Sequence, residues 1–376
     1  MAQPIPFTER KTPWRGVLDL ASGCYPRFLF GGGLGSWLPI FHFHEASREY
    51  LEPYLLHLAR NQYRTVTSEA IAQFVRKGIH PGRRSVALCF DDAWASLWTV
   101  VAPLLKKYGF QAIAYAIPGR IVDSEKLRPT MDDPAWNPIN LDRSSVPFAA
   151  WGELRALQTS GVVDIQAHTF WHGMVFSDAE IQEFVQPGFH RHPHLYPMIA
   201  DEGHDRFLTP ADLGAPLYAQ RSRMSDALRS DHPKAREACL RHVRENGGQE
   251  FFQRSGWEIE LRHVAGNSQG TQETPAERDA AILAELAAAR ETLNSQLKTH
   301  TVRHMCFPWA VCGRAAELAA EKAGYKTAFG DRLFGGRSVR AGDPPYRLMR
   351  LKHNYIYCLP GKERRTLFTV GRKLKK

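Results

Sequence analysis

Residues 86–92 read Val-Ala-Leu-Cys-Phe-Asp-Asp, an apolar run that ends in two adjacent carboxylates. A short apolar run with charged residues on both sides is typical of a buried strand in a parallel sheet. In α/β folds the chemistry gathers at the carboxyl ends of such strands. Asp91 and Asp92 are therefore predicted to lie at a strand tip, where one carboxylate binds a metal and the other accepts a proton.

The two aspartates also have a purely structural interpretation. The apolar positions of residues 93–108 are spaced for one buried face of a helix, with a kink expected at Pro103. Aspartate is favoured just before a helix, so the pair could simply form a turn and cap this one. Taken alone, the first stretch leaves both interpretations open.

A second apolar run, at residues 162–172, ends in two histidines. It reads Val-Val-Asp-Ile-Gln-Ala-His-Thr-Phe-Trp-His, so His168 and His172 stand four residues apart at the end of a predicted strand. If the chain turns there, both imidazoles can bind one metal ion. The chain has 16 histidines, and pairs at this spacing also arise by chance. The pair alone is weak evidence.

The order of these segments is more specific than either of them. A strand ending in Phe-Asp-Asp, a helix, a strand ending in His-Thr-x-x-His and then Met-Cys-Phe-Pro-Trp at residues 305–309 resembles the polysaccharide deacetylases of carbohydrate esterase family 4. The resemblance implies an α/β fold, a distorted (β/α)7 barrel with a large helical and loop insertion. We expect an irregular N-terminal segment at residues 1–39, the barrel at 40–361 with its insertion at about 185–273, and a basic tail at 362–376.

The resemblance also assigns roles to the residues of the first two motifs. Asp91 matches the catalytic base of the family, and the metal ligands match Asp92, His168 and His172. Two imidazoles and one carboxylate suit Zn²⁺, with Co²⁺, Ni²⁺ or Mn²⁺ as alternatives, and they leave coordination positions open for water and a carbonyl oxygen.

Three further residues near these motifs are predicted to contact the substrate. They are Pro308 and Trp309 of the third motif and Trp171 of the second. A backbone N–H after Pro308 would help to hold the oxyanion that forms when water attacks an acetyl carbon.

The chain departs from the family pattern at several positions. Ala93 replaces a usual glycine, and Cys306 occupies the place of an arginine that orients the catalytic aspartate. Arg350, at the end of the last predicted barrel strand, is our candidate for that guanidinium. The sequence Leu-Lys-His ending at His353 is similar to the Leu-x-His motif of the family, which implies that His353 protonates the leaving group. A lone surface histidine is the alternative.

Composition excludes some classes of protein. With 376 residues and 43% hydrophobic residues, the chain can bury a large core. It has no apolar run of about 18 residues that would span a bilayer, and residues 1–15 lack the apolar region of a secretory signal. The six cysteines form no dense framework. These features predict a cytoplasmic protein, with the inner face of the membrane as a more specific location.

The net charge of +10 is uneven along the chain, since residues 362–376 hold seven Lys or Arg and one Glu. This tail is either a solvated terminus or a contact with anionic membrane. Nucleic acid is not a predicted partner, because no nucleic-acid-binding module is present.

The predicted function is metal-dependent removal of an N-acetyl or O-acetyl group from a saccharide, in surface polysaccharide biosynthesis. The acetylated saccharide is expected to be lipid- or nucleotide-linked, because no export signal is predicted and the chain is basic. The alternatives are a catalytically inactive glycan-binding barrel and a membrane-peripheral scaffold in a glycan-assembly complex.

Overall fold

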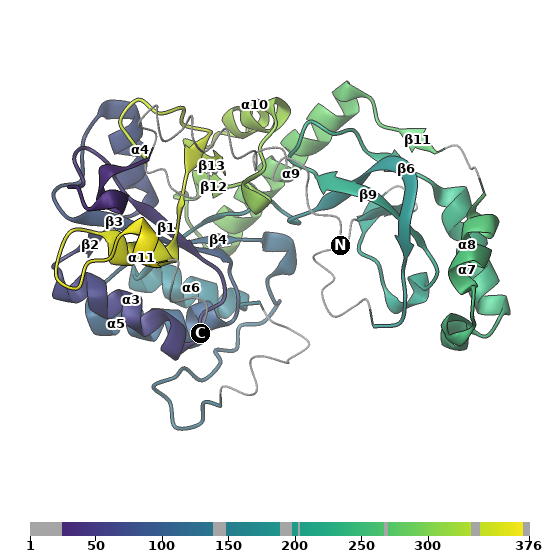
Figure 1. Ribbon diagram of the computed structural model, residues 1–376, viewed down its shortest axis with the longest axis horizontal. Coiled ribbons are helices and arrows are strands. Elements are labelled where there is room, and N and C mark those ends of the chain that lie inside the picture. Colours follow the sequence, from purple (N-terminus) through teal and green to yellow (C-terminus); the bar gives the residue numbers. More distant parts are fainter. Residues whose placement is uncertain are drawn as a thin grey trace. The chain divides into compact units, whose positions relative to one another are not determined.

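The computed structural model describes residues 25–137, 148–188, 198–201, 204–266, 270–331 and 339–370. The chain forms two compact units (Figure 1). We call them the barrel unit, made of Arg10–Trp171, Leu283–Cys312 and Glu317–Lys376, and the insertion unit, made of Met1–Glu9, His172–Ile282 and Gly313–Ala316. The predicted insertion at residues 185–273 falls within the second of them.

The barrel unit is built on a parallel sheet with the strand order β14-β13-β12-β5-β4-β3-β1-β15. The strands are β1 (Ile40–Phe43), β3 (Ser85–Asp92), β4 (Ala112–Ala116), β5 (Val163–Ala167), β12 (His304–Cys306), β13 (Thr327–Asp331), β14 (Leu348–Met349) and β15 (Leu351–Lys352). A short strand, β2 (Arg64–Thr65), also pairs with β3.

One run of chain closes this sheet into a barrel. Strands β14 and β15 are separated only by Arg350; β14 pairs with β13, at one end of the strand order, and β15 pairs with β1, at the other. The eight strands therefore come from seven runs of chain and form a nearly closed parallel barrel. The predicted fold class is confirmed.

Helices connect the barrel strands, precede the first of them or follow the last. They are α3 (Arg48–Arg60), α4 (Ser68–Lys77), α5 (Ala102–Tyr108), α6 (Trp151–Ser160), α9 (Pro275–Gln296), α10 (Arg314–Lys322) and α11 (Leu367–Val370), with short helices at η1 (Arg27–Phe30), η3 (Pro118–Arg120), η9 (Pro308–Ala310) and η10 (His353–Cys358). The helix predicted for residues 93–108 begins as a π-helical segment, η2 (Leu97–Val101), before it continues as α5. The π-helical turns end at residue 101, and Pro103, which has no backbone N–H to donate, lies in the first turn of α5.

The described residues of the insertion unit form three antiparallel strand pairs and two longer helices of its own. Its strands are β6 (Met174–Phe184) with β9 (Pro216–Ser222), β7 (Ile199–Asp201) with β8 (His204–Arg206), and β10 (Ser230–Asp231) with β11 (Thr271–Gln272). Its helices are α7 (Pro233–Glu245) and α8 (Trp257–Ala265), with short turns at η7 (Pro210–Asp212) and η8 (Gly248–Gln253). The strand pairs were not predicted, because β6 lacks a strict alternation of buried and exposed residues.

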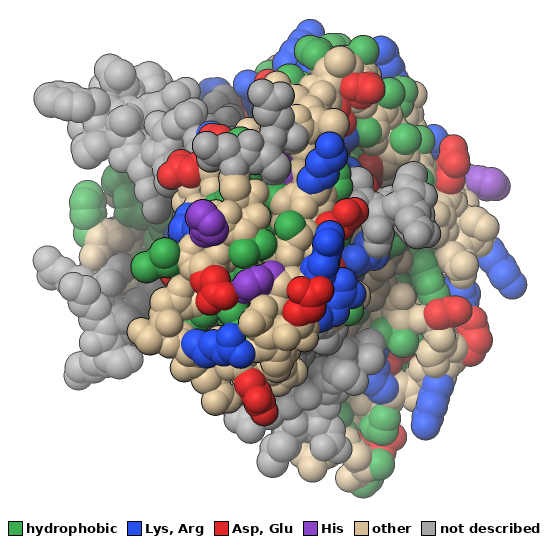
Figure 2. All heavy atoms as spheres, turned by 90° about the vertical axis from the view of Figure 1, so that its right-hand side faces the viewer, with side chains coloured by type: hydrophobic (Ala, Val, Ile, Leu, Met, Phe, Trp, Pro, Cys, Tyr) green, Lys and Arg blue, Asp and Glu red, His purple; other side chains and the backbone are tan. Residues whose placement is uncertain are grey.

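Basic side chains of the insertion unit are paired with acidic ones. The ion pairs include Arg223 with Glu273, Arg229 with Asp205, Arg236 with Asp231 and Arg262 with Glu258. On the face drawn in Figure 2, Lys and Arg side chains are interspersed with Asp and Glu. The basic residues of the unit are thus partly neutralised by their neighbours.

The tail predicted at residues 362–376 is described as far as residue 370, and its last six residues lie outside the described part. Arg364 donates hydrogen bonds to the backbone oxygens of Phe28, Gly31 and Gly32. The first part of the tail is therefore attached to the N-terminal segment. Among the described residues, no helix has the length and apolar character needed to cross a membrane.

Candidate metal and catalytic site

Asp92, His168 and His172 bring three ligand atoms to within 4.8 Å of one another. The sheet register explains how two of them meet. Asp92 is paired with Ala116 of β4, and Ala116 is paired with Ala167, the residue before His168. The ends of β3 and β5 thus lie at the same edge of the sheet, and His172 follows on the same loop.

The backbone at this edge is bent into a conformation that side-chain-bearing residues seldom adopt. Positive φ angles occur at Asp92 (71°), Ala93 (57°), Thr169 (59°) and His172 (56°). Non-glycine residues with positive φ cost about 1–3 kcal/mol each and cluster at functional sites. The Ala93 that replaces a family glycine is one of them, so the glycine-like conformation survives the substitution.

A backbone contact fixes the tautomer of His168. Its Nδ1 lies 2.6 Å from the carbonyl oxygen of Cys306, which can only accept, so Nδ1 carries the proton. The lone pair of a neutral ring is then on Nε2, which lies 3.5 Å from Oδ1 of Asp92. This orientation and the mixed imidazole and carboxylate donors fit a divalent metal ion.

Trp94 holds the other oxygen of the Asp92 carboxylate. Its indole Nε1 donates to Oδ2 of Asp92 at 2.9 Å, and its ring stacks on Phe148 with a centroid distance of 4.7 Å and an interplanar angle of 13°. No sequence pattern singled out Trp94, beyond its place just after the motif. Arg120 was also missed; burial lowers its pKa to about 10, partly offset by the charge of Asp92.

We expect Trp94→Phe to weaken metal binding about tenfold, because hydrogen bonds to metal ligands contribute about 10–100-fold in affinity. The phenyl ring keeps an aromatic surface against Phe148 but cannot donate to Asp92. Competition with a fluorescent chelator measures the affinity. Trp98→Phe is the matched control, since Trp98 donates to the backbone oxygen of Arg128 at 2.7 Å. Equal weakening in both variants would contradict the assignment.

Asp91 is held by a forked ion pair with Arg350. The guanidinium donates to both carboxylate oxygens, at 2.6 and 2.7 Å, and the two residues are only 3% and 8% exposed. The rings of Tyr115 and Phe329 each lie 5.7 Å from the guanidinium carbon. The structure thus brings Arg350 to Asp91, as the sequence suggested.

This pair controls the protonation of Asp91. Burial alone would raise the pKa of its carboxyl group, but the charge of Arg350 and its two hydrogen bonds hold that pKa well below its usual range. Asp91 is therefore an ionised carboxylate at neutral pH, as a base must be.

One histidine near Asp91 is His44. Its Nε2 lies 3.9 Å from Oδ2 of Asp91, and its side chain is 56% exposed. His353 instead has its Nε2 2.7 Å from the Tyr50 hydroxyl, and its ring stacks on Phe43 at 5.3 Å. Burial lowers the pKa of His353. Its role as an acid stays a prediction. His44 was missed, although the alternation of residues 40–44, which read Ile-Phe-His-Phe-His, is a sequence signal that could have pointed to it.

The predicted substrate contacts have different surroundings. Trp171 packs so closely on Gly119 that a Cβ at that glycine would lie 2.4 Å from the indole ring. Pro308 is buried, and Trp309, with a φ of 55°, is partly exposed. Their contact with substrate stays a prediction.

Comparisons with known proteins add a family and a set of distant structural relatives. Residues 78–205 match the polysaccharide deacetylase family model. This range includes Asp91 and Asp92 of β3, and His168 and His172 of the loop after β5. No curated protein matches the chain. Eleven chains of solved structures match. A de-N-acetylase from Aggregatibacter actinomycetemcomitans is 15% identical (TM-score 0.49; 84% of this chain and 94% of that chain covered). The BpsB deacetylase domain from Bordetella bronchiseptica is 17% identical (0.49; 85% and 97%).

Proposed function

The chain belongs to the polysaccharide deacetylase family, and from this membership we propose that it is a metal-dependent enzyme that hydrolyses an acetyl group from a saccharide. The observation that carries the proposal is the cluster of Asp92, His168 and His172 directly beside a buried, ionised Asp91. A barrel that only binds glycans would need neither a set of metal ligands nor a base.

The proposed mechanism gives each residue of the site one task. Asp92, His168 and His172 would hold a divalent ion, which supplies Lewis acidity to polarise an acetyl carbonyl and to make water easier to deprotonate. Asp91 accepts the proton of that water. Arg350 fixes the Asp91 carboxylate, whose two oxygens each keep a further lone pair for the incoming proton.

The proton must then reach the leaving amine or alcohol. Asp91 is a weak acceptor because its pKa is held so low, and it gives the proton up readily. The His44 imidazole, 3.9 Å away and open to solvent, is placed to take it. We propose His44 as the proton donor, in preference to His353.

Family membership supports an acetylated polysaccharide as the substrate class. We propose an N-acetylated or O-acetylated unit of a surface polysaccharide precursor, lipid- or nucleotide-linked, and Zn²⁺ as the metal. Because several basic side chains of the insertion unit pair with acidic ones, the unit lends no support to an anionic linkage, which rests on the sequence alone.

The test is acetate release from N-acetylated and O-acetylated sugar oligomers by metal-depleted and Zn²⁺-reloaded protein. We expect release only after reloading. Asp91→Asn should lower it about 10²–10⁴-fold, the usual contribution of a general base, with metal content unchanged. The exposed Asp279→Asn is the control. Full metal content without acetate release from any of these substrates would favour the inactive glycan-binding barrel.

A further inference from the structure

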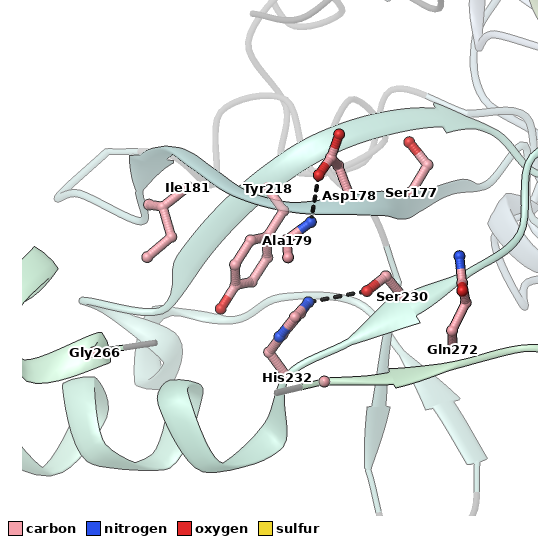
Figure 3. Close-up of a pocket in the computed structure, with 10 residues that line it drawn as sticks. Ser177, Asp178, Ala179, Ile181, Tyr218, Ser230, His232, Gly266 and Gln272 are labelled. Carbon is pink, nitrogen blue, oxygen red and sulfur yellow. Dashed lines mark hydrogen bonds between the residues drawn. The ribbon is translucent and has the colours of Figure 1, made fainter. Parts of the chain in front are cut away.

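A second cavity lies within the insertion unit, with a volume of about 640 Å³. Figure 3 shows its walls. One wall carries Ser177 and Asp178 of β6, and the facing wall carries Ser230 of β10 and Gln272 of β11. Tyr218 of β9 lies between them. None of these residues belongs to the metal cluster.

An irregularity in β6 forms the first wall. Phe176 pairs with Gln220 of β9. The next pair is Ile181 with Tyr218, so β6 uses three more residues than β9 over this interval. The extra residues bulge from the ladder, and Asp178 accepts a hydrogen bond from the following backbone N–H at 2.7 Å (Figure 3). Bulges are frequent next to functional sites, where they change the direction in which a side chain points.

The floor of the cavity is a stacked aromatic pair. The rings of Tyr218 and His232 are 4.4 Å apart and inclined by 27°, and the residues are 5% and 4% exposed. His232 Nε2 lies 2.9 Å from the Ser230 hydroxyl. A Cβ at Gly270 would fall 2.4 Å from the His232 ring. Only glycine at this position lets the ring stay where it is, so the floor is a fixed surface.

The Tyr218 hydroxyl points to a ligand. No described residue forms a hydrogen bond with it, and its oxygen is not one of the fully buried polar atoms, so it faces the open cavity. Burial raises the pKa of Tyr218, so the hydroxyl stays neutral and can both donate and accept. A polar ligand in the cavity would supply the missing partner.

The charge of the lining narrows the class of ligand. Among the described residues, Asp178 contributes the lining's one carboxylate, and neither Lys nor Arg lines the cavity. An anionic ligand such as a phosphate would therefore be disfavoured. The hydroxyls of Ser177, Ser230 and Tyr218 suit a ligand rich in hydroxyl groups, and Asp178 suits an amine.

We propose that this cavity binds a saccharide chain and prefers units that carry a free amine. The choice of ligand rests on the proposed function, because removal of an N-acetyl group produces that amine. The cavity would then hold the chain by units that have already reacted. Its ligand differs from the acetylated unit that the metal site would take.

The test is a titration of the full, metal-depleted protein with a tetramer of β-1,4-linked glucosamine and with its fully N-acetylated counterpart, at slightly acidic pH. Calorimetry gives the dissociation constants. We expect the glucosamine tetramer to bind about tenfold more tightly, the effect of one favourable ion pair. Asp178→Asn keeps the hydrogen bond that shapes the bulge but removes the charge. This variant should show no preference for the glucosamine tetramer, and its affinity for the acetylated tetramer should equal that of wild type.

Two further variants separate the ligand contact from the fold. Tyr218→Phe should weaken the binding of both tetramers about three- to tenfold, the effect of one lost hydrogen bond. Glu180→Gln changes the same charge on an exposed residue of β6 outside the lining, so binding should not change. The proposal is overturned if wild type shows no preference, if Asp178→Asn keeps it, or if Glu180→Gln loses it. Acetate release is assayed separately, so either proposal can fail alone.

Discussion

His168→Ala is expected to reduce bound divalent metal from about one equivalent to below a tenth, and acetate release at least a hundredfold. The substitution removes one of three ligands and leaves Asp92 and His172 too few to hold an ion tightly. Elemental analysis measures the metal. A thermal melt gives an independent readout, since added Zn²⁺ should raise the melting temperature of wild type but not of the variant.

His300→Ala controls for metal bound by surface histidines, because His300 is exposed and outside the cluster. It should retain full metal content and full activity. Stoichiometric metal in His168→Ala, with the same response of the melting temperature as wild type, would mean that other residues hold the ion.

Arg350→Met is expected to lower the free energy of unfolding by about 3–5 kcal/mol, because it leaves the Asp91 carboxylate buried without a partner. Urea titration at neutral pH measures this loss in metal-depleted protein. The double variant Asp91→Asn/Arg350→Met should recover much of it, since no buried charge remains. Activity should be lost in both.

Two other arginine variants sharpen this prediction. Arg350→Lys keeps the positive charge but cannot make the two parallel hydrogen bonds, so activity should fall more than stability. Arg48→Met breaks an exposed pair with Glu52 and should cost far less than Arg350→Met. If the double variant were no more stable than Arg350→Met, packing rather than charge would explain the loss.

The sequence predicted those parts of the site that depend on local pattern. Asp92 ends β3 and His168 directly follows β5, two strands whose apolar runs are visible in the sequence, and parallel strands place such ends together. Arg350 was inferred because it ends the last predicted strand while Cys306 leaves the usual position without a guanidinium. In both cases the order of the strands along the chain allowed short motifs to predict which side chains lie close together.

Other parts of the site depend on side-chain directions that no pattern encodes. Trp94 reaches Asp92 because the chain bends at positive φ between them. His44 lies near Asp91, whereas His353 lies beside the Tyr50 hydroxyl. The alternation of side chains along a strand does not tell which of these two histidines comes close to Asp91. The strand pairs of the insertion unit were missed because the β6 bulge interrupts the period of two that identifies a strand.

The run that closes the barrel also sets an order of events during synthesis. Residues 348–352 are translated after all other barrel strands, and until they dock, β1 and β13 have unpaired edges that invite aggregation. The same run delivers Arg350 to Asp91. On the proposed function, a nascent chain would carry its metal ligands before its catalytic base is fixed, and hydrolytic competence would arise only with the final step of barrel assembly.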